Sequence, residues 1–243
     1  AMQAKRCEIY TDVDGIYTTD PRLTDRARKL AEIGFLEMLE MAALGAKMNP
    51  RSIELGAVYD MPIYVASSFS DEPGTLIHGG EQTMEIRKAV AGIAVDRNVG
   101  KITVRGVVDR PGIAAGLLQP LADAGISIDV VLQNTSSDGT TDFTFTVAQA
   151  DVDAAAEIER NQTNVEFAEV VAGTDLAKVS IVGTGMENAP GYAARMFSTL
   201  AAAGVNIDMI TTSEIRITTI IERSQVQNAV EALHDAFELE KTG

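Results

Sequence analysis

Two similar segments at a constant spacing restrict the fold more than any other feature of this 243-residue sequence. Residues 107–131 read VVDRPGIAAGLLQPLADAGISIDVV, and residues 185–210 read GMENAPGYAARMFSTLAAAGVNIDMI. Matching positions lie 79 residues apart throughout, as Gly112 and Gly191 or Asp129 and Asp208 show. A register kept over this length indicates two copies of one supersecondary unit. The copies are either a duplicated scaffold or a duplicated binding unit.

The first copy contains six predicted elements. Apolar periodicity, turn residues and the Pro-Gly before the first helix set their bounds. They are a strand at 101–108, a helix at 112–124, strands at 126–133 and 141–147, a helix at 152–160 and a strand at 165–171. This order is βαββαβ, the split βαβ plait.

The second copy is one strand short. It is predicted as a strand at 178–183, a helix at 191–203, strands at 205–211 and 215–221 and a helix at 226–236, after which only LEKTG remains of the polar end. A spare strand at 86–95 precedes the first copy. We predict that this strand pairs into the second copy, so that the two repeats interlock.

The N-terminal part alternates strands and helices, which is typical of α/β proteins. We predict a strand at 7–11, a turn-rich stretch at 12–22, a helix through 35–45, a helix in 49–60 and a buried strand at 62–68. Gly45 is the expected C-cap of the first helix, whose buried face is predicted to hold Leu36, Leu39, Ala43 and Leu44. The Gly, Pro and acidic residues of SDEPGTLIHGGEQ predict a loop and a domain boundary near residue 82.

Composition excludes several kinds of partner. The net charge is −15 at pH 7, and the clustered Lys and Arg of nucleic-acid-binding proteins are missing, so no nucleic acid is expected. No apolar run approaches the roughly 20 residues of a membrane helix. Cys7 is the single cysteine, which fits a cytoplasmic protein, and its apolar surroundings predict that it is buried. His78 and His234 are far apart in sequence, so no metal site of the protein's own side chains is predicted.

The repeated unit suits a zwitterionic amino acid. The N–H groups of Gly112, Ile113 and Ala114 at a helix N-terminus suit a carboxylate, and Asp129 suits an ammonium group. Gln133 and Asn134 are then left for the ligand's side chain. In the alternative interpretation Gly112 is only a turn residue, Asp129 is a solvated charge and Asp109 caps the helix.

Segments of both repeats and of the N-terminal part resemble those of a known family. VVDRPGIAA, ISIDVVLQN, DGTTDFTFTV and VNIDMITTSEIRI resemble the tandem ACT domains of aspartate kinase. CEIYTDVDGIYTTDPR and LEMAALGAK resemble the nucleotide-binding stretch and the following helix of its amino-acid-kinase domain. The resemblance implies an α/β (α+β) fold: the C-terminal fragment of an amino-acid-kinase αβα domain followed by two interlocked ferredoxin-like βαββαβ ACT domains. The expected domains are 1–82, 97–173, and 84–96 together with 174–243.

The resemblance also implies an activity, the ATP- and Mg²⁺-dependent phosphorylation of the aspartate side-chain carboxylate. The positions expected at the nucleotide are Thr11, Asp12, Tyr17, Arg22 and Lys47. Arg and Lys suit this role because phosphoryl transfer depends on positioning and charge neutralisation. The family's N-terminal KFGGTS-type segment, which carries the catalytic lysine, is absent from this sequence, so no catalytic residue is assigned. The chain is expected to begin within a domain and to be inactive alone.

Regulation is the second implication. The resemblance implies feedback inhibition by lysine, threonine or both, and a homodimer through the ACT domains or an assembly of regulatory and catalytic subunits. The residues that match the family's effector sites are Asp109, Gly112, Ala114, Asp129 and Gln133 in the first copy and Asn206, Asp208, Thr212 and Ser213 in the second. Met84 matches relatives in which a separate regulatory subunit starts internally. The alternatives are a catalytically silent amino-acid sensor and another amino-acid kinase, such as a glutamate or uridylate kinase.

Overall fold

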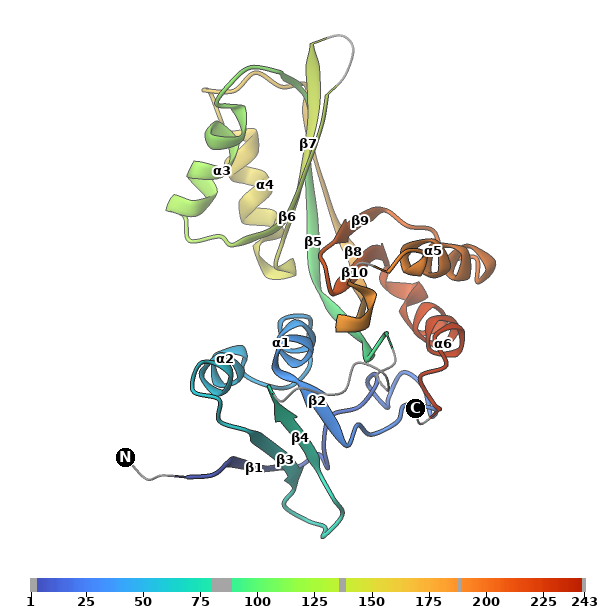
Figure 1. Ribbon diagram of the computed structural model, residues 1–243. Coiled ribbons are helices and arrows are strands. Elements are labelled where there is room, and N and C mark those ends of the chain that lie inside the picture. The colour runs from blue at the N-terminus through green and yellow to red at the C-terminus, as the bar shows by residue number, and fades with distance from the viewer. Residues whose placement is uncertain (1–3, 80–88, 136–138, 188, 242–243) are drawn as a thin grey trace. The chain divides into compact units, whose positions relative to one another are not determined.

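The computed structural model describes residues 4–79, 89–135, 139–187 and 189–241 (Figure 1). The chain divides into two compact units, one formed by Ala1–Asp96 with Lys178–Gly243 and one by Arg97–Ala177. The expected start of a subunit at Met84 and the expected boundary near residue 82 lie outside the described residues.

The N-terminal part of the first unit is a four-stranded sheet of order β1-β3-β4-β2. β1 (Cys7–Thr11) runs parallel to β3 (Ile63–Ser67), β4 (Thr75–His78) runs antiparallel to β3, and β2 (Glu32–Gly34) runs parallel to β4. Helices α1 (Phe35–Ala43) and α2 (Pro50–Val58) pack together in this part (Figure 1). Their core includes the fully buried Met38 and Ile53.

Several N-terminal predictions are confirmed and three are wrong. The strand at 7–11 is β1, the buried strand is β3, and Pro50 opens α2 after the Asn49 cap, as expected. Thr75–His78, predicted as loop, is a strand because it pairs with both β2 and β3.

The face of α1 is the second wrong prediction, at Leu36 and Ala43, which are exposed. Leu44 is buried as predicted, and Leu39 packs partly buried against the core. LEMLEMAAL is apolar on more than one side, and packing selects Phe35, Met38, Met41 and Ala42 for the core, whereas Leu36 is 63% exposed. Cys7 is the third, since it is exposed on β1, a strand at the edge of its sheet.

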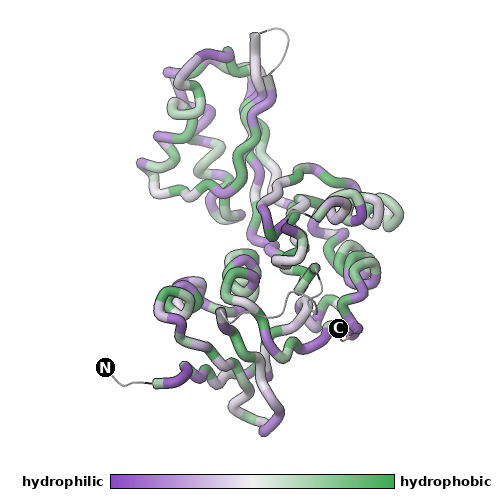
Figure 2. Tube along the Cα trace, viewed as in Figure 1, coloured by the Kyte–Doolittle hydropathy of each residue, from purple (hydrophilic) through white to green (hydrophobic). Residues whose placement is uncertain are grey.

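The second unit is the first copy of the repeat. It holds the later part of β5 (Gly92–Val108), α3 (Ile113–Asp123), β6 (Ile128–Thr135), β7 (Thr140–Val147), a 3₁₀ turn η1 (Gln149–Asp151), α4 (Val152–Arg160) and the earlier part of β8 (Glu169–Val182). Its strand order is β6-β7-β5-β8. Leu117 and Leu121 of α3 pack with Phe143 and Phe145 of β7 in a fully buried core. Figure 2 shows apolar positions alternating with polar ones along these strands.

The second copy belongs to the first unit. After β8 it contains η2 (Thr184–Met186), α5 (Tyr192–Ala202), β9 (Met209–Thr212), β10 (Arg216–Glu222), η3 (Arg223–Gln225) and α6 (Val226–Ala236). Its strand order is β5-β8-β10-β9, and the Ala91 amide donates to the Val182 carbonyl at 2.8 Å. The described part of the spare strand thus lies beside the second copy, while residues 86–88 lie outside the described residues.

Two strand predictions need correction. Residues 92–95 of one expected strand continue into the strand expected at 101–108 as a single strand, β5. Residues 169–171 of another continue into the strand expected at 178–183 as a single strand, β8. The two strands are neighbours in the sheet, so backbone pairing carries each of them through the polar residues that suggested a break. The division between the two units falls inside both strands.

Candidate functional site

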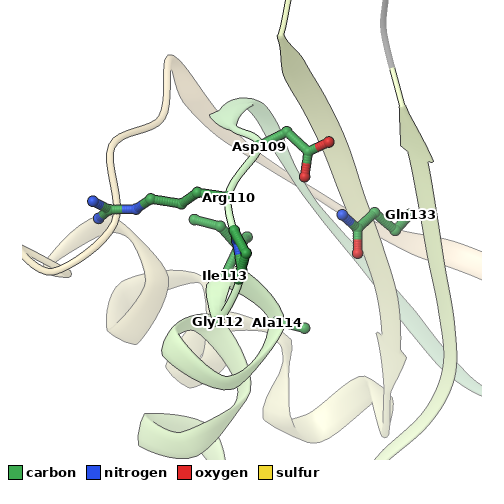
Figure 3. A pocket seen from close by; sticks show the side chains of 7 residues that line it. Asp109, Arg110, Gly112, Ile113, Ala114 and Gln133 are labelled. Carbon is green, nitrogen blue, oxygen red and sulfur yellow. The ribbon is translucent and has the colours of Figure 1, made fainter.

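A pocket of about 430 Å³ opens at the start of α3 in the first copy (Figure 3). It is made by the segment between β5 and α3 and by one side chain of β6. The lining residues are Asp109, Arg110, Pro111, Gly112, Ile113, Ala114 and Gln133.

Gly112 lines this pocket at the start of α3. Gly112 precedes the first turn of α3 with a φ of +94°, a left-handed conformation that favours glycine, and no side chain caps the helix. Asp109 is therefore not the helix cap of the alternative interpretation. The first N–H groups of a helix have no partner within the helix, so this end of α3 suits an anion. The Ile113 amide, which was predicted to bind the ligand's carboxylate, instead donates to the Arg110 carbonyl at 3.3 Å. Gly191 repeats the conformation before α5, with a φ of +103°.

The side chains around this helix end differ in charge and direction. Figure 3 shows the Asp109 carboxylate and the Gln133 amide on the same side of the pocket, with Arg110 extending the other way. The Arg110 Nη2 donates to the Asn164 carbonyl at 3.2 Å. The pocket thus combines a helix N-terminus with a carboxylate and an amide, which is a suitable set for a ligand that carries both a negative and a positive group.

The pocket brings together five of the seven residues predicted for the first site. Asp129 and Asn134 do not line it. Neighbouring residues of a strand point to opposite faces, so Asn134 faces away when Gln133 faces the pocket. Asp129 is four residues from Gln133, roughly 13 Å along β6. Arg110 and Pro111 were not predicted, although the DRPG stretch places both directly before the helix.

The four residues predicted for the second site are all exposed and lie at two places. Asn206 and Asp208 precede β9, whereas Thr212 ends it and Ser213 follows it. The backbone amides of Asp208 and Ser213 donate to Ile220 and Arg216 carbonyls at 2.8 Å each. Thr212 is the counterpart of Gln133 at the repeat spacing of 79 residues. The role of these residues stays a prediction.

In the N-terminal part, the Asp-rich segment after β1 is held by its own ion pairs and hydrogen bonds. Thr11 ends β1, and its hydroxyl donates to Asp12 Oδ1 at 2.9 Å. The Tyr17 hydroxyl donates to Asp14 Oδ1 at 2.9 Å, and Lys29 Nζ donates to Asp14 Oδ2 at 3.1 Å. Burial raises the pKa of Asp14, but the bonds from Lys29 and Tyr17 outweigh it and hold this pKa below its usual value.

Arg22 pairs with a second carboxylate of this segment, Asp20. Arg22 donates to both oxygens of Asp20, at 2.6 Å from Nη2 and 3.0 Å from Nε. The pKa of Asp20 lies below its usual value, chiefly through these bonds, with a smaller contribution from the positive charge of Lys47. Arg22 remains 77% exposed. The placement of Arg22 and Lys47 at a nucleotide stays a prediction.

No helix in the described ranges is both long and apolar enough to cross a membrane.

Comparison with known proteins identifies the parts of the chain. The amino acid kinase family model matches residues 1–67, and ACT domain models match residues 102–170 and 179–237. A curated aspartate kinase from Pseudomonas fluorescens is 48% identical over 242 residues, which cover 99% of this chain. The match covers 59% of that relative, so the chain spans less than two thirds of its length.

Solved structures agree with this assignment. The ligand-free regulatory subunit of aspartate kinase from Thermus thermophilus is 39% identical with a TM-score of 0.58, and the match covers 62% of this chain and 99% of that one. Aspartokinase III from E. coli, in complex with lysine and aspartate in its T state, is 26% identical with a TM-score of 0.77 and covers 97% of this chain, with 52% of its own length matched. The same enzyme in complex with aspartate and ADP, in its R state, is 27% identical with a TM-score of 0.78. That match covers 97% of this chain and 53% of the enzyme's chain. The chain belongs to the aspartate kinase family, as the C-terminal part of an amino-acid-kinase domain followed by two ACT domains.

Proposed function

We propose that this chain is the nucleotide-binding and amino-acid-sensing part of a cytoplasmic aspartate kinase. The full-length enzyme transfers the γ-phosphoryl group of ATP to the side-chain carboxylate of aspartate. Lysine, threonine or both inhibit it through the ACT domains. The observation that carries the proposal is the pocket at the start of α3, because it joins a helix N-terminus to Asp109 and Gln133 in an ACT domain.

The N-terminal part supplies residues that suit a nucleotide. Parallel strands β1 and β3 end at Thr11 and Ser67, and ligands of α/β sheets bind beyond the carboxyl ends of such strands. Arg22 and Lys47 both lie near Asp20, so their positive charges are available to phosphate oxygens beside this edge. Mg²⁺, when bound with the nucleotide, supplies further neutralisation of the phosphate charge. Thr11 and Asp12 orient the nucleotide at the strand end, and Tyr17 is held at the site by Asp14.

The effector site is proposed to take the amino acid's α-carboxylate at the α3 N-terminus. Asp109 then faces the ammonium group, and Gln133 contacts the side chain. The T-state complex of E. coli aspartokinase III contains lysine, which supports lysine as an effector here. Inhibition requires that the effector bind the inactive arrangement of the domains more tightly than the active one. Asp129, Asn134 and the second-copy residues are proposed to contribute from neighbouring ACT surfaces in an assembly.

The assembly is proposed to be a homodimer through the ACT domains or a pairing of catalytic and regulatory subunits. A solved relative supports the second arrangement, since it is a regulatory subunit of aspartate kinase that matches 62% of this chain. The same match supports a second candidate function, a catalytically silent amino-acid sensor. The two candidates differ in whether residues 1–67 bind a nucleotide.

The test of nucleotide binding is a calorimetric titration of this chain with ADP and Mg²⁺. Arg22→Ala removes a cation from the site, and charge-assisted hydrogen bonds are worth about 1.5–3 kcal/mol, so ADP affinity is expected to fall about tenfold or more. Arg51→Ala is the matched control, because Arg51 is equally exposed and paired with Glu54 on α2. Equal affinity of both variants for ADP would contradict the proposed site. Absence of ADP binding together with retained lysine or threonine binding would favour the sensor.

A further inference from the structure

Glu37 of α1 is a buried carboxylate that holds two different parts of the chain. Its side chain is 2% exposed. Oε1 accepts hydrogen bonds from the amide and the hydroxyl of Thr184, at 3.0 and 2.9 Å, and Oε2 accepts from the Gly34 amide at 3.3 Å. One oxygen thus caps the N-terminus of α1, and the other binds the second ACT domain.

A second carboxylate of the same helix repeats this link. Glu40 lies one turn after Glu37, so both face the same side of α1. Its Oε2 accepts from Arg216 Nη1 at 2.7 Å, and both side chains are about three-quarters buried, at 24% and 25% exposure. Glu37 and Glu40 of α1 therefore both bind residues of the second ACT domain.

One of the two segments that α1 contacts carries a predicted residue of the second effector site. Thr184 begins η2, in the segment between β8 and α5, and Arg216 begins β10, directly after the turn that contains Ser213. The two loops also contact one another, because the Gly183 amide donates to the Ile215 carbonyl at 2.9 Å and the Ser213 amide donates to the Arg216 carbonyl at 2.8 Å. A change in either loop therefore reaches Glu37 or Glu40.

The other end of α1 leads to the nucleotide segment. The helix ends at Ala43, and the Ala46 amide donates back to the Met41 carbonyl at 2.9 Å, which ties the following turn to the helix. Lys47 comes directly after this turn, and its charge acts on Asp20, the partner of Arg22. A shift of α1 along or about its axis therefore moves Lys47 relative to Asp20 and Arg22.

We propose that Glu37 is a positioning residue that couples the loops of the second ACT domain to Lys47. The bonds to Thr184 fix α1 and, through the Ala46–Met41 hydrogen bond, the turn that leads to Lys47, and rearrangement of the loop on ligand binding releases or shifts that turn. The inference rests on the proposed function, since it assigns the nucleotide role to Lys47. It deepens that function by naming the contact through which the second ACT domain acts.

The test is hydrogen exchange of the whole chain, read at the amides of Gly45, Ala46 and Met48, which are hydrogen bonded in the turn before and beside Lys47. Glu37→Met keeps the bulk of the side chain and removes both acceptors. Exchange at these three amides is expected to rise about tenfold, the effect of losing a buried charged acceptor on local opening. Thr184→Val, which removes only the hydroxyl donor, is expected to give a smaller rise. The double variant is expected to exchange no faster than Glu37→Met.

The controls separate coupling from a merely structural role. Glu37→Gln retains a carbonyl acceptor for Thr184 and is expected to stay near the wild-type exchange rate. Amides of β3 are expected to be unchanged in all variants. If Glu37→Met affects only the cap at Gly34–Glu37, or raises exchange equally in β3, the coupling proposal is wrong.

An ADP titration of the same samples keeps the two proposals apart. If wild-type chain binds ADP while the exchange response is missing, the proposed function stands and the coupling fails. If the exchange response is present and ADP does not bind, the coupling stands as a contact between the two parts and the nucleotide role of Lys47 fails.

Discussion

The Nε2 atom of His234 lies 3.0 Å from the hydroxyl oxygen of Thr18, and both side chains are fully buried. Thr18 belongs to the segment after β1, whereas His234 lies in α6 near the other end of the chain. Arg26 pairs with Asp235, and Arg28 Nε donates to the Leu239 carbonyl at 3.2 Å. The N-terminal part and the second ACT domain thus share a polar contact that is closed to solvent.

Thr18→Val is expected to destabilise this contact. The Thr18 hydroxyl also accepts from the Arg28 amide at 3.0 Å, so the substitution leaves two buried groups without their partner, at a cost of about 1–3 kcal/mol. For a chain of this size the thermal midpoint is expected to fall by roughly 2–4 °C per kcal/mol. The neighbouring Thr19 is the control, because its buried hydroxyl has no hydrogen-bond partner among the described residues. Thr19→Val is therefore expected to be neutral or stabilising, and equal losses in both variants would contradict the account.

Glu159 on α4 makes the stability of the first ACT domain pH dependent. Its side chain is fully buried, and burial raises its pKa to about 7, against a lowering by the hydrogen bond from Gln162. The folded chain therefore binds the proton more tightly than the unfolded chain, whose glutamate has a pKa of about 4.3. The stabilisation from this group is complete below about pH 4 and is lost as the pH rises to about 7.

Glu159→Gln is expected to remove this dependence. The variant has a higher thermal midpoint than the wild type at pH 8, and the difference shrinks towards pH 5, where the wild-type side chain is protonated. Glu157→Gln, at an exposed position of the same helix, is the control and is expected to show no such trend. A Glu159→Gln difference that is the same at both pH values would contradict the assigned cause.

Gly45 joins α1 to β5 through a close backbone approach. Its φ is +110°, and a Cβ atom there lies 2.5 Å from the Val95 carbonyl oxygen, which cannot move away as a flexible side chain does. Gly45→Ala is expected to cost about 1–3 kcal/mol for the backbone strain, with the clash added. Gly125→Ala has a similar strain, with a φ of +75°, but meets no atom within 4 Å. Denaturant unfolding of both variants measures the difference, and a smaller loss for Gly45→Ala would contradict the contact.

The sequence predicts the helices of the repeat well because local signals mark both of their ends. Pro-Gly precedes and Ala-Gly follows α3 and α5, which differ from the predicted 112–124 and 191–203 by one residue at each end. α4 coincides with its predicted bounds, Val152–Arg160. These signals act through the backbone of the residues themselves, so tertiary structure does not override them.

The predictions that fail depend on contacts with distant residues. The TLIH segment of β4 is flanked by loop-forming residues, and only its pairing with β2 and β3 makes it a strand. The pocket residues at the start of α3 are predicted from the sequence, because DRPG marks the start of the helix. The pocket residue on β6 is predicted less well. There the one residue that faces the pocket depends on the strand's orientation, which selects Gln133 and excludes Asn134. The buried bonds of Glu37 join residues 147 positions apart and have no local signal.

The central claim, that the pocket at α3 senses an amino acid, is tested most directly by thermal unfolding with lysine, threonine and both together. A ligand at a hundred times its dissociation constant adds about 2.7 kcal/mol, which is several degrees at roughly 2–4 °C per kcal/mol. The account predicts such a shift for the wild type and for Gln119→Leu, an exposed glutamine of α3 outside the pocket lining, and its loss in Gln133→Leu. No shift in the wild type, or an equal shift in Gln133→Leu, would contradict it.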